Sequence, residues 1–300
     1  SFLMAFLSKE TAIAQLAIFP LILYFFTDMP LKKILIFAAS MFGFMILALS
    51  ITVLFLPPID RAFAYFENPI AYADNFFQVV ASGFYSLGWY LKMLLVPYPL
   101  GFYYGNNMLP VVNFTNIWAI LSFITYVSML VYAIYNIKKK TFISFVILYF
   151  LVNISMYANI VAPVPGIVGD RFMFVPSLAF SMFFIWLLFK LFGLNIKEEK
   201  LNRKRLSFIL AILFIIIAPF SYYVHERNTN WRSEYKLYNS DISHLEKSAK
   251  ANQLFAMAQL ELVNINLAKK VNTYEFIQGM IEISEKHFLK AVEVDSSMYP

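Results

Sequence analysis

Long apolar runs constrain this chain more than any other feature of its sequence. A membrane-spanning helix needs roughly 20 apolar residues to cross about 30 Å of hydrocarbon. Five or six segments approach that length: 11–26, 34–56, 117–137, 142–162, 172–189 and 206–224. Hydrophobic residues make up 60% of the 300 residues and charged residues only 14%, whereas soluble domains carry about 25% charged residues. The sequence therefore predicts an all-α, polytopic membrane protein.

Composition also narrows the kinds of site that the chain can hold. It has no cysteine, so it offers neither a disulfide framework nor a thiolate metal site. Three scattered histidines, His225, His244 and His287, do not suggest a histidine-built site, and we predict no metal. We attribute the net charge of +6 to lysines in cytoplasmic loops. We therefore expect membrane lipid, and no nucleic acid, among the partners.

Positively charged residues indicate which loops face the cytoplasm. They concentrate in three short connections: 32–33, 138–140 and 197–205. The positive-inside rule places all three in the cytoplasm, so an even number of helices crosses the membrane between the first two. Segments 34–56 and 117–137 already supply two crossings. We therefore expect the remaining apolar segment, 78–96, to lie in the interface or to form a re-entrant element against protein.

Counting onward places further segments outside the cytoplasm: 57–116, 163–171 and everything after 224. The chain thus divides into a membrane core, residues 1–224, and an extracytoplasmic part, residues 225–300. Within that part the pattern predicts amphipathic helices at 246–268 and 274–294. The second resembles the closing helix of a tetratricopeptide repeat, a unit of about 34 residues that is stable only in arrays. A generic helical hairpin is the alternative.

Four polar clusters fall on the outer side in this topology. Their candidate binding residues are Lys9 and Glu10, Glu67 and Asn68, Asp170 and Arg171, and Arg227 and Arg232. Taken singly, each has a structural explanation: a snorkelling pair, an aromatic interfacial belt, an ion pair or a juxtamembrane anchor. Ionisable groups at membrane depth are functional candidates, and arginine suits bidentate phosphate binding. Together the clusters predict an outer polar cavity for a lipid-linked phosphate.

The same stretches carry a family resemblance. The sequence runs in order through "LSKE", "ENP", "PYPLGFYYG", "DRFMFVPS" and "RNTNWRSEYKLY". In this it resembles the transmembrane and tetratricopeptide-repeat (TMTC) proteins and their bacterial relatives, over the C-terminal half of their membrane core and the start of their repeats. The resemblance implies a GT-C fold, the architecture of glycosyltransferases that use polyprenyl- or dolichyl-phosphate sugars. TMTC members are protein O-mannosyltransferases whose repeats lie on the non-cytoplasmic side.

The resemblance also implies roles for individual residues. Arg171, with Lys9 or Arg227, would hold the donor phosphate, and Asp170 would fix the guanidinium of Arg171 or meet the acceptor. The lipid tail would lie in a groove lined by Phe and Ile, and the repeats would present a protein or glycan acceptor. GT-C enzymes carry their catalytic acid in the first outer loop, which would lie upstream of residue 1. We therefore assign no catalytic residue, and no cofactor besides the lipid-linked donor, which is a substrate.

Two other functions stay open. An O-antigen-ligase-like enzyme also uses a polyprenyl donor, but it needs basic residues in one large outer loop, and 57–116 offers only Arg61 and Lys92. A non-enzymatic membrane anchor that displays repeats for assembly is the other alternative. Richness in Ile, Lys, Phe and Asn is typical of an AT-rich bacterium, so we expect the inner membrane, with the repeats in the periplasm. The sequence does not specify the sugar, the acceptor or the lipid length.

Overall fold

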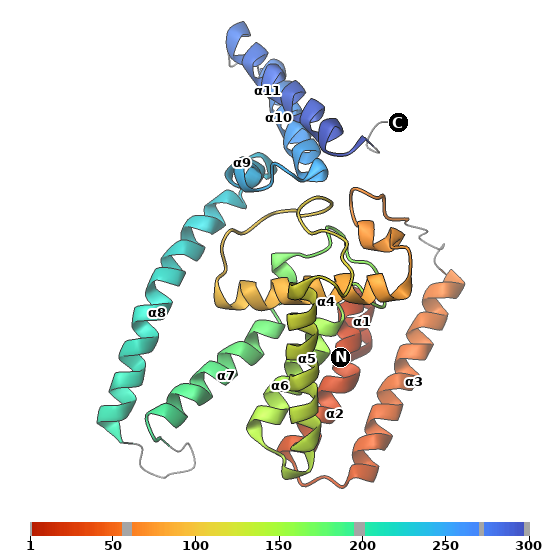
Figure 1. The fold of residues 1–300 in the computed structure, drawn as a ribbon, viewed down its shortest axis with the longest axis vertical. Helices are drawn as coiled ribbons and strands as arrows, with labels where there is room; N and C mark the ends of the chain where they lie inside the picture. The colour runs from red at the N-terminus through yellow and green to blue at the C-terminus, as the bar shows by residue number, and fades with distance from the viewer. Residues whose placement is uncertain (1, 56–61, 195–201, 270–272, 297–300) are drawn as a thin grey trace.

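The computed structural model describes residues 2–55, 62–194, 202–269 and 273–296, and all regular structure among them is helical. The all-α prediction is therefore confirmed. One helix, α4 (Phe76–Leu95), runs crosswise to a group of upright or inclined helices (Figure 1). That group consists of α2 (Gln15–Phe26), α3 (Leu31–Phe55), α5 (Ile117–Tyr135), α6 (Phe142–Ser155), α7 (Pro176–Leu191) and α8 (Arg203–Asn230). The short helix α1 (Phe2–Ser8) packs against α3.

Three of these helices are long and apolar enough to cross a membrane: α3, α5 and α8. The helices α2, α6 and α7 are apolar but shorter. The described chain is therefore compatible with a membrane protein, with fewer full-length spans than the sequence predicts. Residues 197–201 of the third basic connection, and Arg61 of the first outer loop, lie outside the described residues.

The predicted span 142–162 is wrong in its last third, because α6 ends at Ser155. Beyond it the chain turns through Asn159, whose backbone is left-handed with φ 58°. The buried Asn159 side chain donates to the Ile167 carbonyl at 2.7 Å and accepts from the Val164 N–H at 2.8 Å. At 1.5 Å per residue α6 is about 21 Å long, whereas the hydrocarbon core is about 30 Å thick.

For two other predicted spans, the helix in the structure has a different outer end from the predicted one. The helix predicted at 172–189 begins only at Pro176, which occupies the first turn of α7, where its missing N–H has no intrahelical partner to lose. The residues before it form a 3-10 turn, Asp170–Met173. In contrast, α8 continues past residue 224 to Asn230, so Arg227 lies on a helix. Helix ends therefore position the candidate residues of both regions.

The segment predicted not to cross the membrane is α4, and its crosswise orientation agrees with that expectation (Figure 1). The Asn75 side chain caps its N-terminus by accepting from the Gln78 N–H at 3.0 Å. Small residues allow close approach to α5, since a Cβ on Gly88 would lie 3.2 Å from the Ser122 Cβ. Helix α4 therefore rests against protein, which is the setting that non-spanning backbone requires at that depth.

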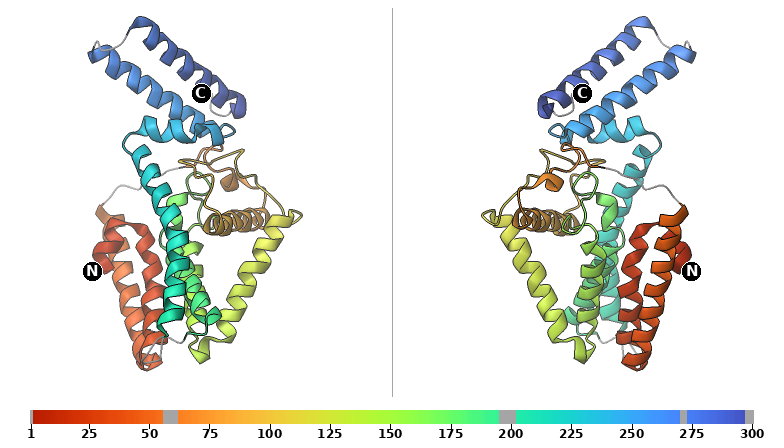
Figure 2. Two further views of the ribbon diagram at one scale, coloured as in Figure 1. Left: turned by 90° about the vertical axis from the view of Figure 1, so that its left-hand side faces the viewer. Right: turned by 90° about the vertical axis from the view of Figure 1, so that its right-hand side faces the viewer.

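The loops that flank α4 lie on the side away from the upright helices, which we call the outer side (Figure 2). Three C-terminal helices lie beyond these loops: α9 (Glu234–Asp241), α10 (Ala249–Lys269) and α11 (Tyr274–Val294). The rings of Phe102 and Tyr238 lie 4.3 Å apart, and Asn106 Nδ2 donates to Asp295 Oδ2 at 2.9 Å. The loop after α4 therefore fastens the C-terminal helices to the rest of the molecule.

The helices α10 and α11 form an antiparallel hairpin. Ser284 Oγ donates to the Ala256 carbonyl at 2.8 Å, and the Lys290 ammonium donates to the Glu246 carboxylate at 2.7 Å. From Ser284 to Lys290 the chain of α11 runs forward, while the residues that it contacts run backward from Ala256 to Glu246. The two helices therefore run in opposite directions. The predicted range 274–294 matches α11, whereas α10 begins slightly later than predicted.

Candidate functional site

Asp170 is the centre of a polar cluster on the outer side of α4. It opens the 3-10 turn that leads into α7, and its carboxylate is partly buried. Asp170 Oδ2 accepts from the Gly101 N–H at 2.9 Å, and Oδ1 accepts from the Tyr104 hydroxyl at 2.9 Å. Gly101 and Tyr104 belong to the loop after α4. Asp170 therefore ties the turn before α7 to that loop.

The surroundings of Asp170 change its acidity. Burial raises the pKa of the Asp170 carboxyl above its ordinary value, and the hydrogen bonds from Gly101 and Tyr104 and the nearby Arg227 guanidinium oppose the rise. Burial, followed by the charge of Asp170, raises the pKa of the Tyr104 hydroxyl, so this hydroxyl remains protonated and continues to donate. Asp170 therefore accepts a proton more readily than a surface aspartate does.

The expected contact between Asp170 and Arg171 is absent, because both oxygens of Asp170 bind the loop after α4. Among the described residues Arg171 forms no ion pair, and it is exposed. Its guanidinium lies over the ring of Phe172, 4.9 Å from the centroid, and Phe172 stacks on Tyr157 at 4.4 Å. Arg171 is therefore a guanidinium on an aromatic platform, with its hydrogen-bond donors available.

Arg227 has a structural partner that the sequence did not predict. Its guanidinium forms a bidentate pair with Asp241 at the end of α9, with Nη2 and Oδ2 2.7 Å apart. The Asp241 side chain is only 2% exposed and that of Arg227 14%. Ser240 Oγ also donates to Asp241 Oδ1 at 2.7 Å. This ion pair joins α8 to α9 and occupies the guanidinium that was predicted to bind phosphate.

Asn68 is also used within the protein. It is fully buried, and its Nδ2 donates to Asn159 Oδ1 at 2.8 Å and to the Val164 carbonyl at 2.8 Å. Its Oδ1 accepts from the Ile70 N–H at 3.0 Å. These bonds use both amide hydrogens and the oxygen, so Asn68 holds two outer loops together and presents no polar group to a ligand.

The other candidates do not join this cluster through any described contact. Lys9 is exposed where α1 ends, and the side chain of Glu10 lies outside the described part of the chain. Arg232 is exposed in the turn after α8. Glu67 is partly buried, and its carboxylate accepts from the Ala64 N–H at 3.4 Å. The structure thus brings together the loop after α4, the turn before α7, and the junction of α8 with α9.

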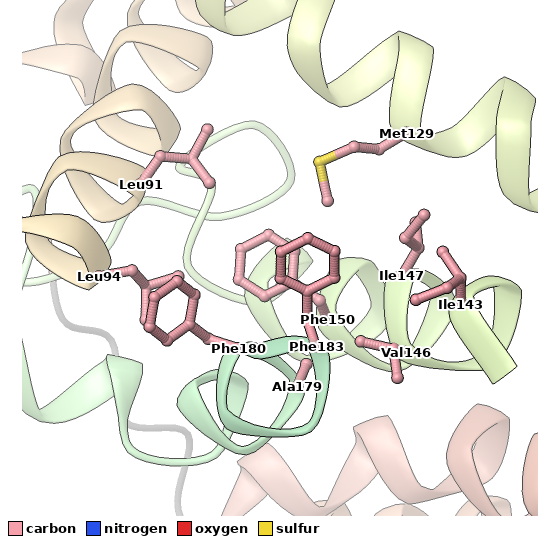
Figure 3. Close-up of a pocket in the computed structure, with 10 residues that line it drawn as sticks. All are labelled: Leu91, Leu94, Met129, Ile143, Val146, Ile147, Phe150, Ala179, Phe180 and Phe183. Atoms are coloured by element: carbon pink, nitrogen blue, oxygen red, sulfur yellow. The ribbon is translucent and has the colours of Figure 1, made fainter. Parts of the chain in front are cut away.

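An apolar cavity of about 280 Å³ lies between α4, α5, α6 and α7 (Figure 3). Leu91 and Leu94 line it from α4, Val146 from α6, and Phe180 and Phe183 from α7. All its lining side chains are apolar. The volume is close to the lower end of the range for small-molecule sites, about 300–1,000 Å³. Such a cavity suits a hydrocarbon or isoprenoid chain.

Sequence reasoning missed three residues of the polar cluster: Gly101, Tyr104 and Asp241. The first two stand in "PYPLGFYYG", which was noted as an aromatic interfacial belt and for the family resemblance, and Asp241 lies within the last polar cluster, residues 225–242. No sequence signal paired them with Asp170 or Arg227. In the described part of the chain, no group of three or more His, Asp or Glu side chains is arranged to hold a metal ion.

Comparisons with known proteins add no relative. No family model, no curated protein and no solved structure matches the chain.

Proposed function

We propose that this chain forms the donor-binding part of a membrane glycosyltransferase that takes its sugar from a polyprenyl-phosphate carrier. The observation that carries the proposal is the position of Arg171 directly before a helix that lines the apolar cavity. Arg171 lies in the turn that leads into α7, and Phe180 of α7 lines the cavity. A polyprenyl phosphate joins an anionic head group to an isoprenoid tail, so its site needs a cation next to an apolar groove.

The spacing along α7 between its first residue and the cavity suits such a donor. Helix α7 begins at Pro176, and a rise of 1.5 Å per residue puts Phe180 about 6 Å and Phe183 about 10 Å further along its axis. A donor with its phosphate at Arg171 would therefore reach the cavity with the first part of its tail. The apolar lining favours the tail and disfavours the head group.

The polar cluster has a supporting role in this proposal. Asp170 fixes the turn that carries Arg171 through its bonds to Gly101 and Tyr104, and it does not neutralise the guanidinium. The ring of Phe172 orients that guanidinium from one face. A preorganised, unpaired arginine binds a phosphate with less loss of side-chain entropy than a mobile one does.

Finer assignments accompany the proposal. We assign residues 1–224 to a polytopic core of the GT-C type and residues 225–300 to an extracytoplasmic tetratricopeptide-like segment. The crosswise α4 and the antiparallel pair of α10 and α11 support this division. The core would lie in a bacterial inner membrane, and the periplasmic repeats would present the acceptor, with a protein serine or threonine as the first choice.

A non-enzymatic membrane anchor is the second candidate, and one observation favours it. Asn68, Asp170 and Arg227, three of the candidate site residues, direct their polar atoms to contacts within the protein. An anchor that holds a helical segment at the outer surface needs such contacts and needs no ligand. The two candidates differ in whether the chain binds a lipid-linked sugar.

The test is binding of a polyprenyl-phosphate-linked hexose to the full chain in lipid nanodiscs. A charge-assisted hydrogen bond is worth about 1.5–3 kcal/mol, so Arg171→Ala should weaken binding roughly tenfold to hundredfold. Arg171→Lys should lose part of this affinity, because a point charge replaces a planar fork. The matched control is Arg203→Ala, which removes an exposed arginine from the first turn of α8.

A second arm of the test examines the cavity. A hexose phosphate without a tail should bind at least about a hundredfold more weakly than the lipid-linked form, because burying apolar surface supplies most of the affinity. If folded Arg171→Ala binds the donor as the wild type does, the phosphate site is not at Arg171. If the wild type binds no polyprenyl phosphate at all, the anchor function is favoured instead.

A further inference from the structure

One face of α8 changes from apolar to polar towards the outer end of the helix. Residues separated by three, four or seven positions share a face of an α-helix. On α8 these are Pro219, Phe220, Tyr223, Glu226, Arg227 and Asn230. At 1.5 Å per residue they extend over about 16 Å. A ligand lying along this face would meet apolar side chains at one end and hydrogen-bonding groups at the other.

The end of α4 and the loop after it form the opposite wall. An apolar cavity of about 360 Å³ lies between Leu95 and Val96 on one side and Phe220 on the other. A polar cavity of about 240 Å³ lies further out, against the outer end of α8 and the end of α9. Tyr98 and Tyr223 line both cavities. The two cavities are therefore the apolar and polar halves of one groove.

The charges in the polar half disfavour an anionic head group. The Arg227 guanidinium is paired with the buried Asp241, and Glu226 adds an exposed carboxylate. The carboxylate of Asp170 is close enough to Arg227 for the two charges to interact. Among the described residues that line this half, no guanidinium or ammonium is left unpaired. A phosphate or sulfate would therefore meet the carboxylates of Glu226 and Asp241 here, beside a guanidinium that is already paired.

The groups that remain suit a sugar. Tyr98 and Tyr223 present exposed rings, and Tyr98 packs edge-on against His244 at 5.8 Å. Asn230 adds an amide at the end of α8, one turn beyond Glu226. Sugar rings offer C–H faces to aromatic rings, and they offer hydroxyls to amides and carboxylates. We propose that this groove binds a glycolipid, whose tail lies against Phe220 and whose uncharged, hydroxyl-rich head group lies against Tyr223 and Asn230.

The groove is separate from the proposed donor site. It is formed by α8, the loop after α4, and the end of α9, and none of its lining residues lines the cavity between α4 and α7. The glycolipid site therefore does not rest on the donor proposal. Arg171→Ala, which should weaken donor binding, should leave glycolipid binding unchanged.

The test uses the full chain in phosphatidylcholine nanodiscs, with empty nanodiscs as the background. Calorimetry measures the binding of octyl glucoside, octyl sulfate and octanol below their micellar concentrations. Octyl glucoside should bind saturably and at least about tenfold more tightly than the other two, since only it offers several hydroxyls to the amide and carboxylates of the polar half. Tyr223→Ala and Asn230→Ala should each weaken its binding by about tenfold, the effect of one lost polar or aromatic contact.

Matched controls come from the neighbouring face of α8. Tyr222 and Asn228 are exposed but line neither half of the groove, so Tyr222→Ala and Asn228→Ala should bind octyl glucoside normally. Glu226→Gln, at an exposed position, provides a further variant if Tyr223→Ala unfolds at a lower temperature. Equal binding of octanol, tighter binding of octyl sulfate, no saturable binding, or normal binding by all three groove variants would each overturn the proposal.

Discussion

The two sides of α4 are stabilised in different ways. Towards the upright helices, only 6% of the most apolar stretch of α8 is buried inside the protein, so most of its apolar side chains face outward. On the outer side, polar side chains are buried, and specific partners satisfy them: Asn68 is 0% exposed and Asp241 1%. The first side depends on non-directional burial, and the second on directional hydrogen bonds and ion pairs.

This difference shows where a substitution should matter. An apolar side chain that faces outward from α8 has no single partner to lose, and lipid can cover whatever replaces it. An outer polar group has one or two partners, which are left buried and unsatisfied when it is removed. The outer side is therefore the more sensitive to single changes, and it positions the turn that carries Arg171.

The prediction with the largest expected effect concerns cysteine labelling, which tests whether the two sides of α4 lie on opposite faces of a membrane. The chain has no cysteine, so single cysteines can be introduced without background. Asp74→Cys and Asn113→Cys, at exposed positions before and after α4, should both react with a membrane-impermeant maleimide from outside. Asn202→Cys, just before α8, should react only after permeabilisation. Opposite accessibility at Asp74 and Asn113 would mean that α4 crosses the membrane.

The next effect concerns the ion pair that joins α8 to α9. Asp241→Ala leaves the partly buried Arg227 guanidinium without its carboxylate partner, so it should destabilise the outer side by at most about 3–5 kcal/mol. Hydrogen exchange of the α9 amides in the full chain measures this. The control is Glu246→Ala, which breaks the exposed pair with Lys290 and should change little. Equal effects of the two substitutions would contradict the distinction between buried and exposed pairs.

A smaller effect is expected at the buried amide that holds two outer loops. Asn68→Ala leaves the Ile70 N–H and the Val164 carbonyl without their partner, which should cost about 1–3 kcal/mol. Faster exchange of amides in the loop 164–169 would report it. The control, Asn228→Ala, replaces an exposed asparagine of α8 and should leave exchange in that loop unchanged. Unchanged exchange in Asn68→Ala would show that the loops are held by other contacts.

The sequence predicted the parts of the fold that depend on local pattern. The range 274–294 matches α11 because its apolar residues repeat at helical spacing. The segment 78–96 was separated from the spans by counting charged loops, and α4 indeed lies across the upright helices. In both cases the deciding information lies within the segment or in the loops beside it.

The sequence did not predict the features that depend on contacts between distant segments. The early end of α6 depends on Asn159, whose side chain binds Asn68 from another loop. The partners of Asp170 come from the loop after α4, so the contact with the adjacent Arg171, one of two roles expected of Asp170, does not form. No periodicity or spacing encodes which buried polar groups will meet. Only the folded structure therefore shows which partners these polar residues have.

The smallest expected effect is a pH response confined to the hairpin of α10 and α11. His287 Nδ1 lies 2.8 Å from Asn252 Oδ1, and its ring packs edge-on against Phe255 at 4.7 Å. Burial, followed by the charges of Lys290 and Lys286, lowers the pKa of His287 below its ordinary value of 6.5. The neutral imidazole therefore fits the folded hairpin better than the charged one does.

The sign of the response follows from this shift. As the pH falls through the ordinary value, the unfolded hairpin takes up a proton before the folded one, so stability is full above that value and decreases below it. Because His287 is only partly buried, solvent screening keeps the loss of stability well under about 1.4 kcal/mol per pH unit.

Hydrogen exchange of the α10 and α11 amides should therefore be modestly faster near about pH 5.5 than near about pH 7.5, after correction for the intrinsic rate. His287→Gln should abolish this pH difference in exchange, whereas the control His244→Gln should retain it. The helices α3 and α5 contain no histidine, so exchange of their amides should not respond to pH in this way. A pH response that persists in His287→Gln would assign the sensitivity to another group and remove the distinction between the hairpin and the upright helices.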